Sequence, residues 1–249
     1  MNVVAIVQAR MGSTRLPGKV MEDLSGKPVL DRVIEAVHAC AMIDRVVVAT
    51  TELPEDDVLA RHARALGAGV VRGDTHDVLE RYRVAAAESD ARVVVRLTAD
   101  CPLLDPAVVG AVVAALGPDV DYASNTHTRS FPRGLDVEAF HVDTLQRLAR
   151  LARSPSAREH VTAFVLERPD LFAIRQVVAT SDDSDLRVTV DTPADLVVVR
   201  AIWAALGTNR RPPGDEVVAF LRGRPDLRAL NSDVVQTSWR DAERMRPHA

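Results

Sequence analysis

Short β-branched runs alternate with segments of helical periodicity along the first half of the chain. The β-branched runs contain almost no polar positions, whereas the segments between them repeat apolar residues every three to four positions. The pattern predicts strands at 3–7, 45–49, 69–71 and 93–97, and helices at 28–40, 55–66, 75–88 and 106–116. Because near-continuous apolar strands separated by helices are typical of a parallel sheet covered on both faces, we expect an α/β fold.

Residue types at the helix starts support this division. Pro28 falls in the first turn of the first helix, Asp74 or Thr75 is expected to cap the third, and Asp105 the fourth.

The pattern changes after residue 121. Residues 122–130 are polar and predict a loop, and 135–140 alternates like a strand. The remaining pattern predicts helices at 142–153, 157–167 and 193–206, and strands near 172–178 and at 186–190. Pro212 and Pro213 interrupt the segment 207–214. We therefore expect a main domain over 1–206, and a linker with a C-terminal helical tail over 207–249.

Composition narrows the class of protein. The chain has 249 residues, is 47% hydrophobic and carries a net charge of -4, so nothing indicates binding to nucleic acid. The apolar run at the N-terminus is too short to span a membrane. Cys40 and Cys101 form no disulfide framework, and no histidine has zinc-ligand spacing. We expect a soluble, cytoplasmic protein.

The segment QARMGSTRLPGK, residues 8–19, follows the first strand directly and combines a glycine, hydroxyl groups and cations. These groups are Gly12, Ser13, Thr14, Arg10, Arg15 and Lys19. Such a turn suits a polyphosphate, which binds backbone N–H groups and cations together, although an ordinary surface turn is the alternative. The spacing argues against a P-loop, because five residues separate Gly12 from Gly18 and Val20 follows Lys19.

Two aspartates end strands of the expected sheet. Asp100 follows the strand at 93–97, and Asp191 follows the strand at 186–190. Ligands bind at the carboxyl ends of such strands, so segments 8–19, 72–77, 98–104 and 191–195 are expected to lie together. Paired carboxylates there suit Mg²⁺. Alternatively, Asp191 caps the helix that follows and Asp100 closes a turn. Asp195 is expected to be a solvated acid of the first helical turn, and support of the metal-binding carboxylates is its alternative role.

Eight motifs in order carry a resemblance to a known family. They are QARMGSTRLPGK, GKPVLDRVIEAV, ATTELPEDD, RGDTHDVLERY, RLTADCPLLDP, SNTHTRSFPRGLDVEAF, SAREHVT and LRVTVDTPADL, which together cover about residues 3–200. The chain resembles the cytidylyltransferase family, which includes the CMP-Kdo and CMP-sialic acid synthetases, and within it the branch called spore coat polysaccharide biosynthesis protein F.

The resemblance implies a Rossmann-like nucleotidyltransferase with a mostly parallel central sheet flanked by helices. It also implies a small inserted acceptor and dimerisation subdomain at about 122–168, and hence a homodimer. The implied reaction transfers CMP from CTP to an acidic acceptor, with Mg²⁺ as cofactor and pyrophosphate as product. A 3-deoxy-ulosonic acid sugar and a small phosphonate are both consistent with the sequence as acceptors.

The resemblance also assigns roles to residues. The implied nucleotide-binding residues are Gln8, Ala9, Arg10, Gly12, Ser13, Arg15, Lys19, Arg72, Gly73, Thr98 and Asp100. The implied catalytic residues are Arg10, Arg15, Lys19, Asp100 and Asp191, of which Asp100 and Asp191 hold the metal. In this assignment Arg72 and Gly73 read the cytosine; alternatively, Arg72 is a surface charge.

The acceptor is expected to bind along 125–138 and at the start of the helix near 157. The residues that we assign to it are Asn125, Arg133, Asp136, Glu138, Arg158 and His160. Asp136 and Glu138 are two apart and would share one face of a strand, where facing solvent is the alternative. Two other functions stay open at this point: transfer from another nucleotide to a sugar-1-phosphate, and a non-catalytic nucleotide-binding relative.

Overall fold

The computed structural model describes residues 2–207 and 210–236. Its strands are β1 (Val3–Gln8), β2 (Arg45–Thr51), β3 (Gly69–Gly73), β4 (Val93–Thr98), β5 (Tyr122–Ser124), β6 (Glu138–His141) and β7 (Ile174–Gln176). Its α-helices are α1 (Val29–His38), α2 (Asp57–Ala65), α3 (Val78–Glu88), α4 (Pro106–Ala115), α5 (Val142–Leu151), α6 (Pro155–Glu159), α7 (Ala163–Glu167), α8 (Pro193–Leu206), α9 (Gly214–Arg222) and α10 (Pro225–Asn231). Parts of the expected linker and tail, residues 208–209 and 237–249, lie outside the described residues.

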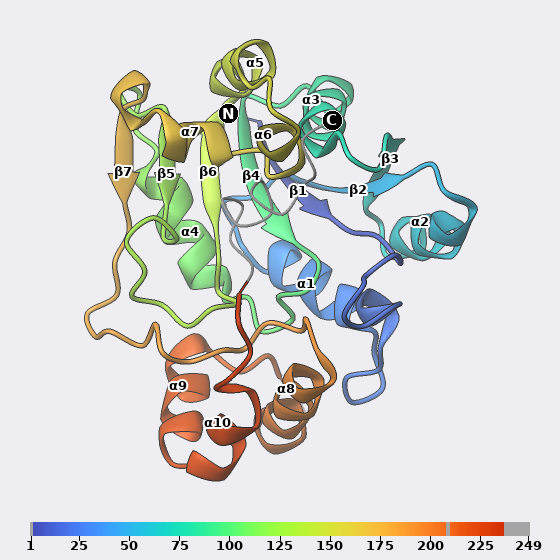
Figure 1. The fold of residues 1–249 in the computed structure, drawn as a ribbon, viewed down its shortest axis with the longest axis vertical. Helices are drawn as coiled ribbons and strands as arrows, with labels where there is room; N and C mark the ends of the chain where they lie inside the picture. The colour runs from blue at the N-terminus through green and yellow to red at the C-terminus, as the bar shows by residue number, and fades with distance from the viewer. Residues whose placement is uncertain (1, 208–209, 237–249) are drawn as a thin grey trace.

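The strands of the described residues form one sheet in the order β3-β2-β1-β4-β6-β5-β7. The pairs among β3, β2, β1 and β4 are parallel, whereas β6 runs antiparallel to both β4 and β5. Helices cover both faces of this sheet (Figure 1). The predicted α/β fold with a mostly parallel sheet is therefore confirmed.

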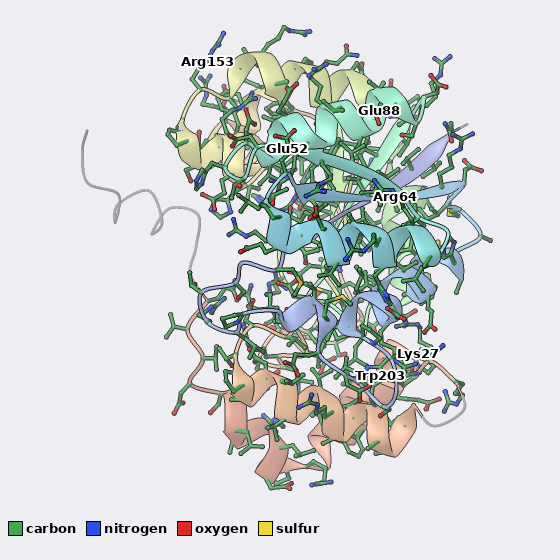
Figure 2. All side chains as sticks on the ribbon, turned by 90° about the vertical axis from the view of Figure 1, so that its right-hand side faces the viewer. Lys27, Glu52, Arg64, Glu88, Arg153 and Trp203 are labelled. Atoms are coloured by element: carbon green, nitrogen blue, oxygen red, sulfur yellow. The ribbon has the colours of Figure 1, made fainter. Side chains whose placement is uncertain are left out.

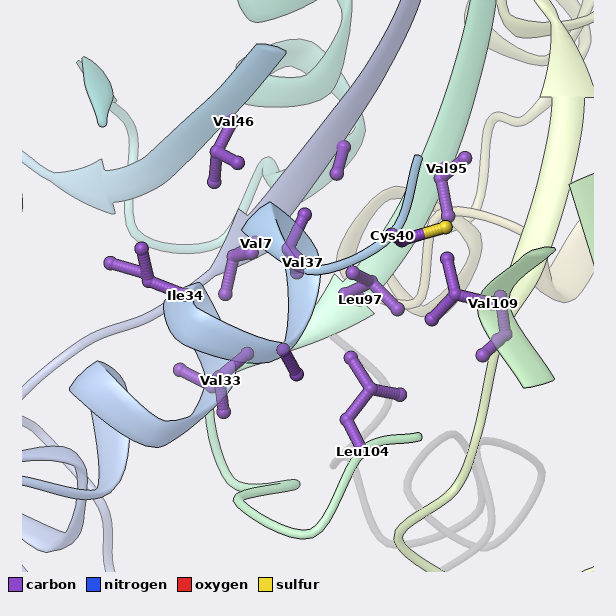
Figure 3. Packing of buried hydrophobic residues seen from close by; sticks show 14 of the residues in the cluster. Val7, Val33, Ile34, Val37, Cys40, Val46, Val95, Leu97, Leu104 and Val109 are labelled. Atoms are coloured by element: carbon purple, nitrogen blue, oxygen red, sulfur yellow. The ribbon is translucent and has the colours of Figure 1, made fainter. Parts of the chain in front are cut away.

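Alternate residues of the central strands supply two separate cores. Ala5 and Val7 of β1 face α1, α2 and α4, whereas Val4 and Ile6 face α3 and α5–α7. Figure 3 shows the first of these cores, where Val33 and Val37 of α1 pack near the strands. Burying both faces explains why these strands contain so few polar residues.

A third apolar cluster joins α8, α9 and α10 to Leu24 and Val29 near the N-terminus of α1. Trp203 is its largest side chain, and Figure 2 shows it on the side of α8 that faces the rest of the fold. The Arg32 guanidinium lies 4.1 Å from the Trp203 ring centroid.

Arg211, in the segment expected to be a linker, donates to the carbonyls of Pro102 (3.0 Å) and Leu104 (3.1 Å). The C-terminal helices are thus joined to the loop that follows β4.

Several predicted boundaries are wrong for identifiable reasons. The third helix begins at Val78, because the Asp77 side chain accepts from the Glu80 amide and caps it, while Asp74 closes the preceding turn. The expected loop at 122–130 contains the buried strand β5. The expected strand at 135–140 begins only at Glu138, because the Asn125 side chain takes over the hydrogen bonds of the Val137 amide and the Leu135 carbonyl.

Residues 186–190 do not join the sheet, although their alternation predicts a strand. They form an isolated bridge with Arg133, whose amide donates to the Leu186 carbonyl (2.9 Å) and whose carbonyl accepts from the Val188 amide (2.7 Å). Gly134 makes this approach possible: it has a φ of +111°, and a Cβ there would lie 2.6 Å from the Thr189 nitrogen.

The helix expected at 157–167 is two short helices, α6 and α7, separated at residues 160–162. Val161 has a φ of +53° although it is β-branched and fully buried. A non-glycine residue in this region stores strain of about 1–3 kcal/mol. No helix within the described residues is both long and apolar enough to cross a bilayer.

Candidate active site

The carboxyl ends of β1 and β4 form the floor of a cleft. Gln8 lies opposite Thr98 in the parallel register, and the buried Tyr82 hydroxyl lies within hydrogen-bonding distance of the carbonyls of Ile6 (3.0 Å) and Leu97 (3.1 Å) just below. The cavity at this edge measures about 340 Å³. Polar and charged side chains dominate its lining: Gln8, Arg10, Ser13, Thr14, Arg15, Lys19, Arg81, Thr98, Asp100, Glu159, His160, Asp191 and Gln236.

The loop after β1 is held in a compact turn. The Met11 amide donates to Asp56 Oδ1 (2.6 Å), and the Met11 carbonyl accepts from the amides of Ser13 and Gly18, both at 2.9 Å. Gly18 adopts a φ of +72°, which favours glycine at this position. The turn brings Arg10, Ser13, Arg15 and Lys19 to the wall of one cavity, as the sequence predicts for a polyphosphate site.

Lys19 lies between the two aspartates that the sequence singles out. Its Nζ donates to Asp100 Oδ2 and to Asp191 Oδ1, each at 2.7 Å. Burial by itself would lower the pKa of Lys19, but the two carboxylates outweigh burial and raise it above its ordinary value. Burial likewise would raise the pKa of Asp100, and the ammonium of Lys19 outweighs it and lowers that pKa. Lys19 and Asp100 are therefore both charged near neutral pH.

Asp191 reaches this position without a sheet strand before it. The Val190 amide and the Thr189 hydroxyl both donate to the carbonyl of Asp100, at 2.8 and 3.0 Å. These bonds fix the backbone before Asp191 directly beside Asp100. Thr192, whose hydroxyl accepts from the Asp195 amide, caps α8. Asp191 is therefore not the helix cap that the sequence left open as its alternative role.

Asp195 is not the solvated acid that we expected; its contacts agree with the alternative role, support of the carboxylate of Asp191. Its side chain is fully buried, and it completes a capping box with Thr192 at the start of α8. Its Oδ1 accepts from Arg187 Nε (2.8 Å), and Arg187 Nη2 in turn donates to Asp191 Oδ2 (2.7 Å). Spacing alone suggested a solvated first-turn acid, because nothing in the local sequence shows that Arg187 lies beneath it.

The donor set of this pair fits a hard divalent cation. Asp100 and Asp191 each direct a carboxylate oxygen to the same point, and the ammonium of Lys19 already occupies it as a cation. Mg²⁺ commonly takes one or two protein carboxylates and completes its shell with water and substrate phosphates. No cluster of three or more His, Cys, Asp or Glu ligands occurs in the part of the chain that the structure describes.

A second chamber of about 500 Å³ adjoins the first across Thr98, Asp100, His160 and Asp191. Its other charged lining residues are Arg96, Arg129, Arg133, Asp136 and Glu138. Arg129 and Asp136 form a bidentate ion pair at 2.7 and 2.8 Å. The Arg133 guanidinium, by contrast, makes no ion pair with any residue that the structure describes. The chamber therefore has cationic character available for an anion.

The other residues predicted to bind the acceptor lie in different surroundings. Glu138 is buried and bonded to Arg96, Tyr122 and Thr162 (Thr162 Oγ1 at 2.7 Å). Asn125 is buried, and its side-chain amide donates to the Leu135 carbonyl and accepts from the Val137 amide. Arg158 donates to Asp77 (Nε to Oδ2, 3.0 Å), outside both chambers. His160 lines both chambers.

Arg72 also lies away from the cleft. Its guanidinium donates to the Thr51 carbonyl (2.8 Å), the Leu53 carbonyl (2.9 Å) and Asp57 (2.6 Å), and neither it nor Gly73 lines the cavity. Arg81, which the sequence did not single out, lines it instead. Burial lowers the pKa of Arg81, and its Nε has no hydrogen-bond partner among the described residues. The sequence feature that could have identified Arg81 is its position one helical turn after Val78, on the apolar face of α3.

Comparison with known proteins gives a consistent assignment. Residues 4–197 match the family model for cytidylyltransferases. The chain is 30% identical to the spore coat polysaccharide biosynthesis protein SpsF of Bacillus subtilis, over 90% of this chain and 96% of that protein. It is 31% identical to a 3-deoxy-manno-octulosonate cytidylyltransferase of Anaeromyxobacter dehalogenans, over 82% of this chain and 98% of that protein.

A solved structure agrees with these matches. A cytidylyltransferase from Leptospira borgpetersenii superposes with a TM-score of 0.88 and 29% identity, covering 96% of this chain and all of that one. The chain therefore belongs to the cytidylyltransferase family of nucleotidyltransferase enzymes.

Proposed function

We propose that this enzyme transfers CMP from CTP to a small anionic acceptor and releases pyrophosphate. The observation that carries the proposal is the convergence of the loop cations Arg15 and Lys19 on the paired carboxylates of Asp100 and Asp191. Cations for a triphosphate and oxygens for its metal thus meet where two chambers join. CTP is favoured among nucleotides because the relatives that name a donor are cytidylyltransferases.

The chamber beside the first loop is proposed to hold the triphosphate. Arg10, Arg15 and Lys19 supply positive charge, and Ser13 supplies a hydroxyl and an amide at the compact turn. Arg81 adds a further cation from the α3 side in our assignment, in place of Arg72. Fixed cations around a leaving pyrophosphate lower the barrier because they stabilise the charge that develops on it.

Asp100 and Asp191 would hold Mg²⁺, which when bound would neutralise the phosphate charge and polarise the reacting phosphorus. The chain's own contribution is positional. Lys19 keeps the two carboxylates together, and Arg187 and Arg15 fix the second oxygen of Asp191 at 2.7 and 3.1 Å. An acceptor oxygen in the neighbouring chamber would attack in line, opposite the departing pyrophosphate.

The neighbouring chamber is proposed to bind the acceptor. Arg133 is suited to an acceptor carboxylate or phosphonate because the chain provides it with no ion pair among the described residues. A 3-deoxy-ulosonic acid is the acceptor class that we favour, since a relative that covers most of this chain is named for one.

Pyrophosphate release in the presence of Mg²⁺ tests the proposal. CTP, UTP, GTP and ATP would each be paired with ulosonic acids, aminoalkylphosphonates and sugar-1-phosphates. We expect release with CTP and an acceptor of the ulosonic acid class. Release only with another nucleotide and a sugar-1-phosphate would contradict it.

Replacement of Arg133 by alanine is expected to raise the KM for the acceptor by about 10–100-fold, because a charge-assisted contact worth about 1.5–3 kcal/mol is lost. The KM for CTP should change by less than about 2-fold, since Arg133 lies outside the triphosphate chamber. Initial rates at varied acceptor and fixed CTP give both constants.

Arg158→Ala is the matched control, because it removes an arginine that pairs with Asp77 outside both chambers. An equal rise in acceptor KM for Arg158→Ala and Arg133→Ala would contradict the assignment of this chamber.

A further inference from the structure

All three nitrogen atoms of the Arg187 guanidinium donate hydrogen bonds. Nε donates to Asp195 Oδ1 (2.8 Å), Nη1 to Gln236 Oε1 (2.8 Å) and Nη2 to Asp191 Oδ2 (2.7 Å). Because a guanidinium is planar and rigid, two of these bonds fix the direction of the third. The orientation of the Asp191 carboxylate therefore depends on what holds the other end of Arg187.

Part of that support comes from α10. Asn231 is buried, and its Nδ2 donates to Asp195 Oδ1 (2.9 Å) and to the Arg187 carbonyl (3.2 Å). Asp195 Oδ2 also accepts from the Asp191 amide (3.1 Å). One amide side chain from α10 thus contacts both residues that fix Asp191.

Gln236 supplies the rest of the support. Figure 1 shows the segment that follows α10 leaving the group of C-terminal helices and running back toward the sheet. There Gln236 lines both chambers of the cleft. Asn231 and Gln236 both lie beyond residue 197, where the match to the family model ends.

Docking of α10 alone does not require these contacts. Leu227 already buries an apolar side chain from the same helix in the third cluster. A buried amide costs free energy unless it is hydrogen-bonded. Here both hydrogen bonds of the Asn231 amide nitrogen go to Asp195 and Arg187.

We infer that Asn231 and Gln236 are positioning residues that act through Arg187 and Asp195 to aim the carboxylate of Asp191 at its divalent cation. The inference rests on the metal-binding role of Asp191 in the proposed function. Side chains that orient metal ligands in this way contribute about 10–100-fold to metal affinity or activity.

The test measures Mn²⁺ binding to the full chain by the loss of the free-ion EPR signal, which needs no turnover. Asn231→Ala and Gln236→Met are each expected to weaken Mn²⁺ binding by about 10-fold or more. Gln236→Glu keeps an acceptor for Arg187 and adds a negative charge to the cleft, so it should bind Mn²⁺ at least as tightly as the wild type does. Gln236 is exposed, so its variants do not put folding at risk.

Leu227→Ala is the matched control on α10, because it removes buried volume without touching the polar contacts. It should lower thermal stability and leave Mn²⁺ affinity unchanged. The Mg²⁺ concentration that half-saturates pyrophosphate release should rise for Asn231→Ala and Gln236→Met. The KM for the acceptor should not rise for Asn231→Ala, because Asn231 lines neither chamber.

The outcomes separate this inference from the proposed function. Wild-type Mn²⁺ affinity in Asn231→Ala and Gln236→Met overturns the inference even if CTP is turned over. A loss in Leu227→Ala as large as in Asn231→Ala also overturns it. Weakened Mn²⁺ binding in a chain that never turns over CTP supports the inference and overturns the proposed reaction. A wild type that turns over CTP but binds no Mn²⁺ overturns the inference and leaves the reaction standing.

Discussion

Replacement of Asp100 or Asp191 by asparagine is expected to lower kcat for pyrophosphate release by about 1,000-fold. Asparagine keeps the size of the side chain but removes the charge that would hold a divalent cation in the proposed function. One oxygen of each carboxylate lies 2.7 Å from Lys19 Nζ, so the two carboxylates face the same position and the loss of either removes half of the pair. Steady-state rates at saturating CTP and acceptor, over a range of Mg²⁺ concentrations, measure the effect.

Asp182→Asn serves as the control, because that carboxylate is exposed and lies outside both chambers. It should keep wild-type turnover within about 2-fold, as expected for a surface change. Retention of a tenth or more of wild-type kcat in both Asp100→Asn and Asp191→Asn would rule out these carboxylates as metal ligands.

The second large effect is expected for Lys19→Met, which should lower kcat/KM for CTP by about 100-fold or more. Methionine fills similar space but removes the ammonium from the triphosphate chamber and from between the two carboxylates. A change confined to the KM for the acceptor would contradict the assignment of Lys19 to the nucleotide side.

Lys19→Met should also change how stability depends on pH. Asp100 has a lowered pKa, so its contribution is complete above its ordinary value of 3.8 and is lost as pH falls through the lowered value. Lys19 has a raised pKa, so its contribution is complete below 10.5 and is lost as pH rises through the raised value. The wild type should therefore exceed Lys19→Met most in stability between those limits.

Thermal unfolding of both proteins over a pH series measures this difference. The difference in Tm should be flat around neutral pH and shrink toward both extremes. A difference that grows as the solution becomes more acidic than pH 3.8 would contradict the coupling of Lys19 to the carboxylates.

The parts of the fold that the sequence predicted are those with strong local signals. β1, β2 and β4 follow runs rich in β-branched residues, and α8 begins where Thr192 and Pro193 predict the start of a helix. A polyphosphate-binding role for the first loop could also be predicted, because glycine, hydroxyl groups and cations occur together within a dozen residues.

The parts that the sequence did not predict depend on partners distant in the chain. Residues 186–190 alternate like a strand, but their hydrogen bonds go to Arg133 and Asp100 rather than to the sheet. Asp195 looks like an ordinary first-turn acid until Arg187 is placed beneath it. Arg72 and Arg81 are nine positions apart, and only the packing of α3 determines which of them reaches the cleft.

The left-handed backbone at Val161 has a consequence for protein engineering. A search for stabilising substitutions would select Val161→Gly early, because glycine at this position would relieve strain in the main chain. Its neighbours His160 and Thr162 line the chamber proposed for the acceptor, and Val161 itself fills space in the second core. Glycine would empty that space and leave both neighbours freer to move. The strain that glycine relieves is therefore set against lost packing and looser walls of the chamber proposed for the acceptor, and a more stable variant has to be sought elsewhere in the chain.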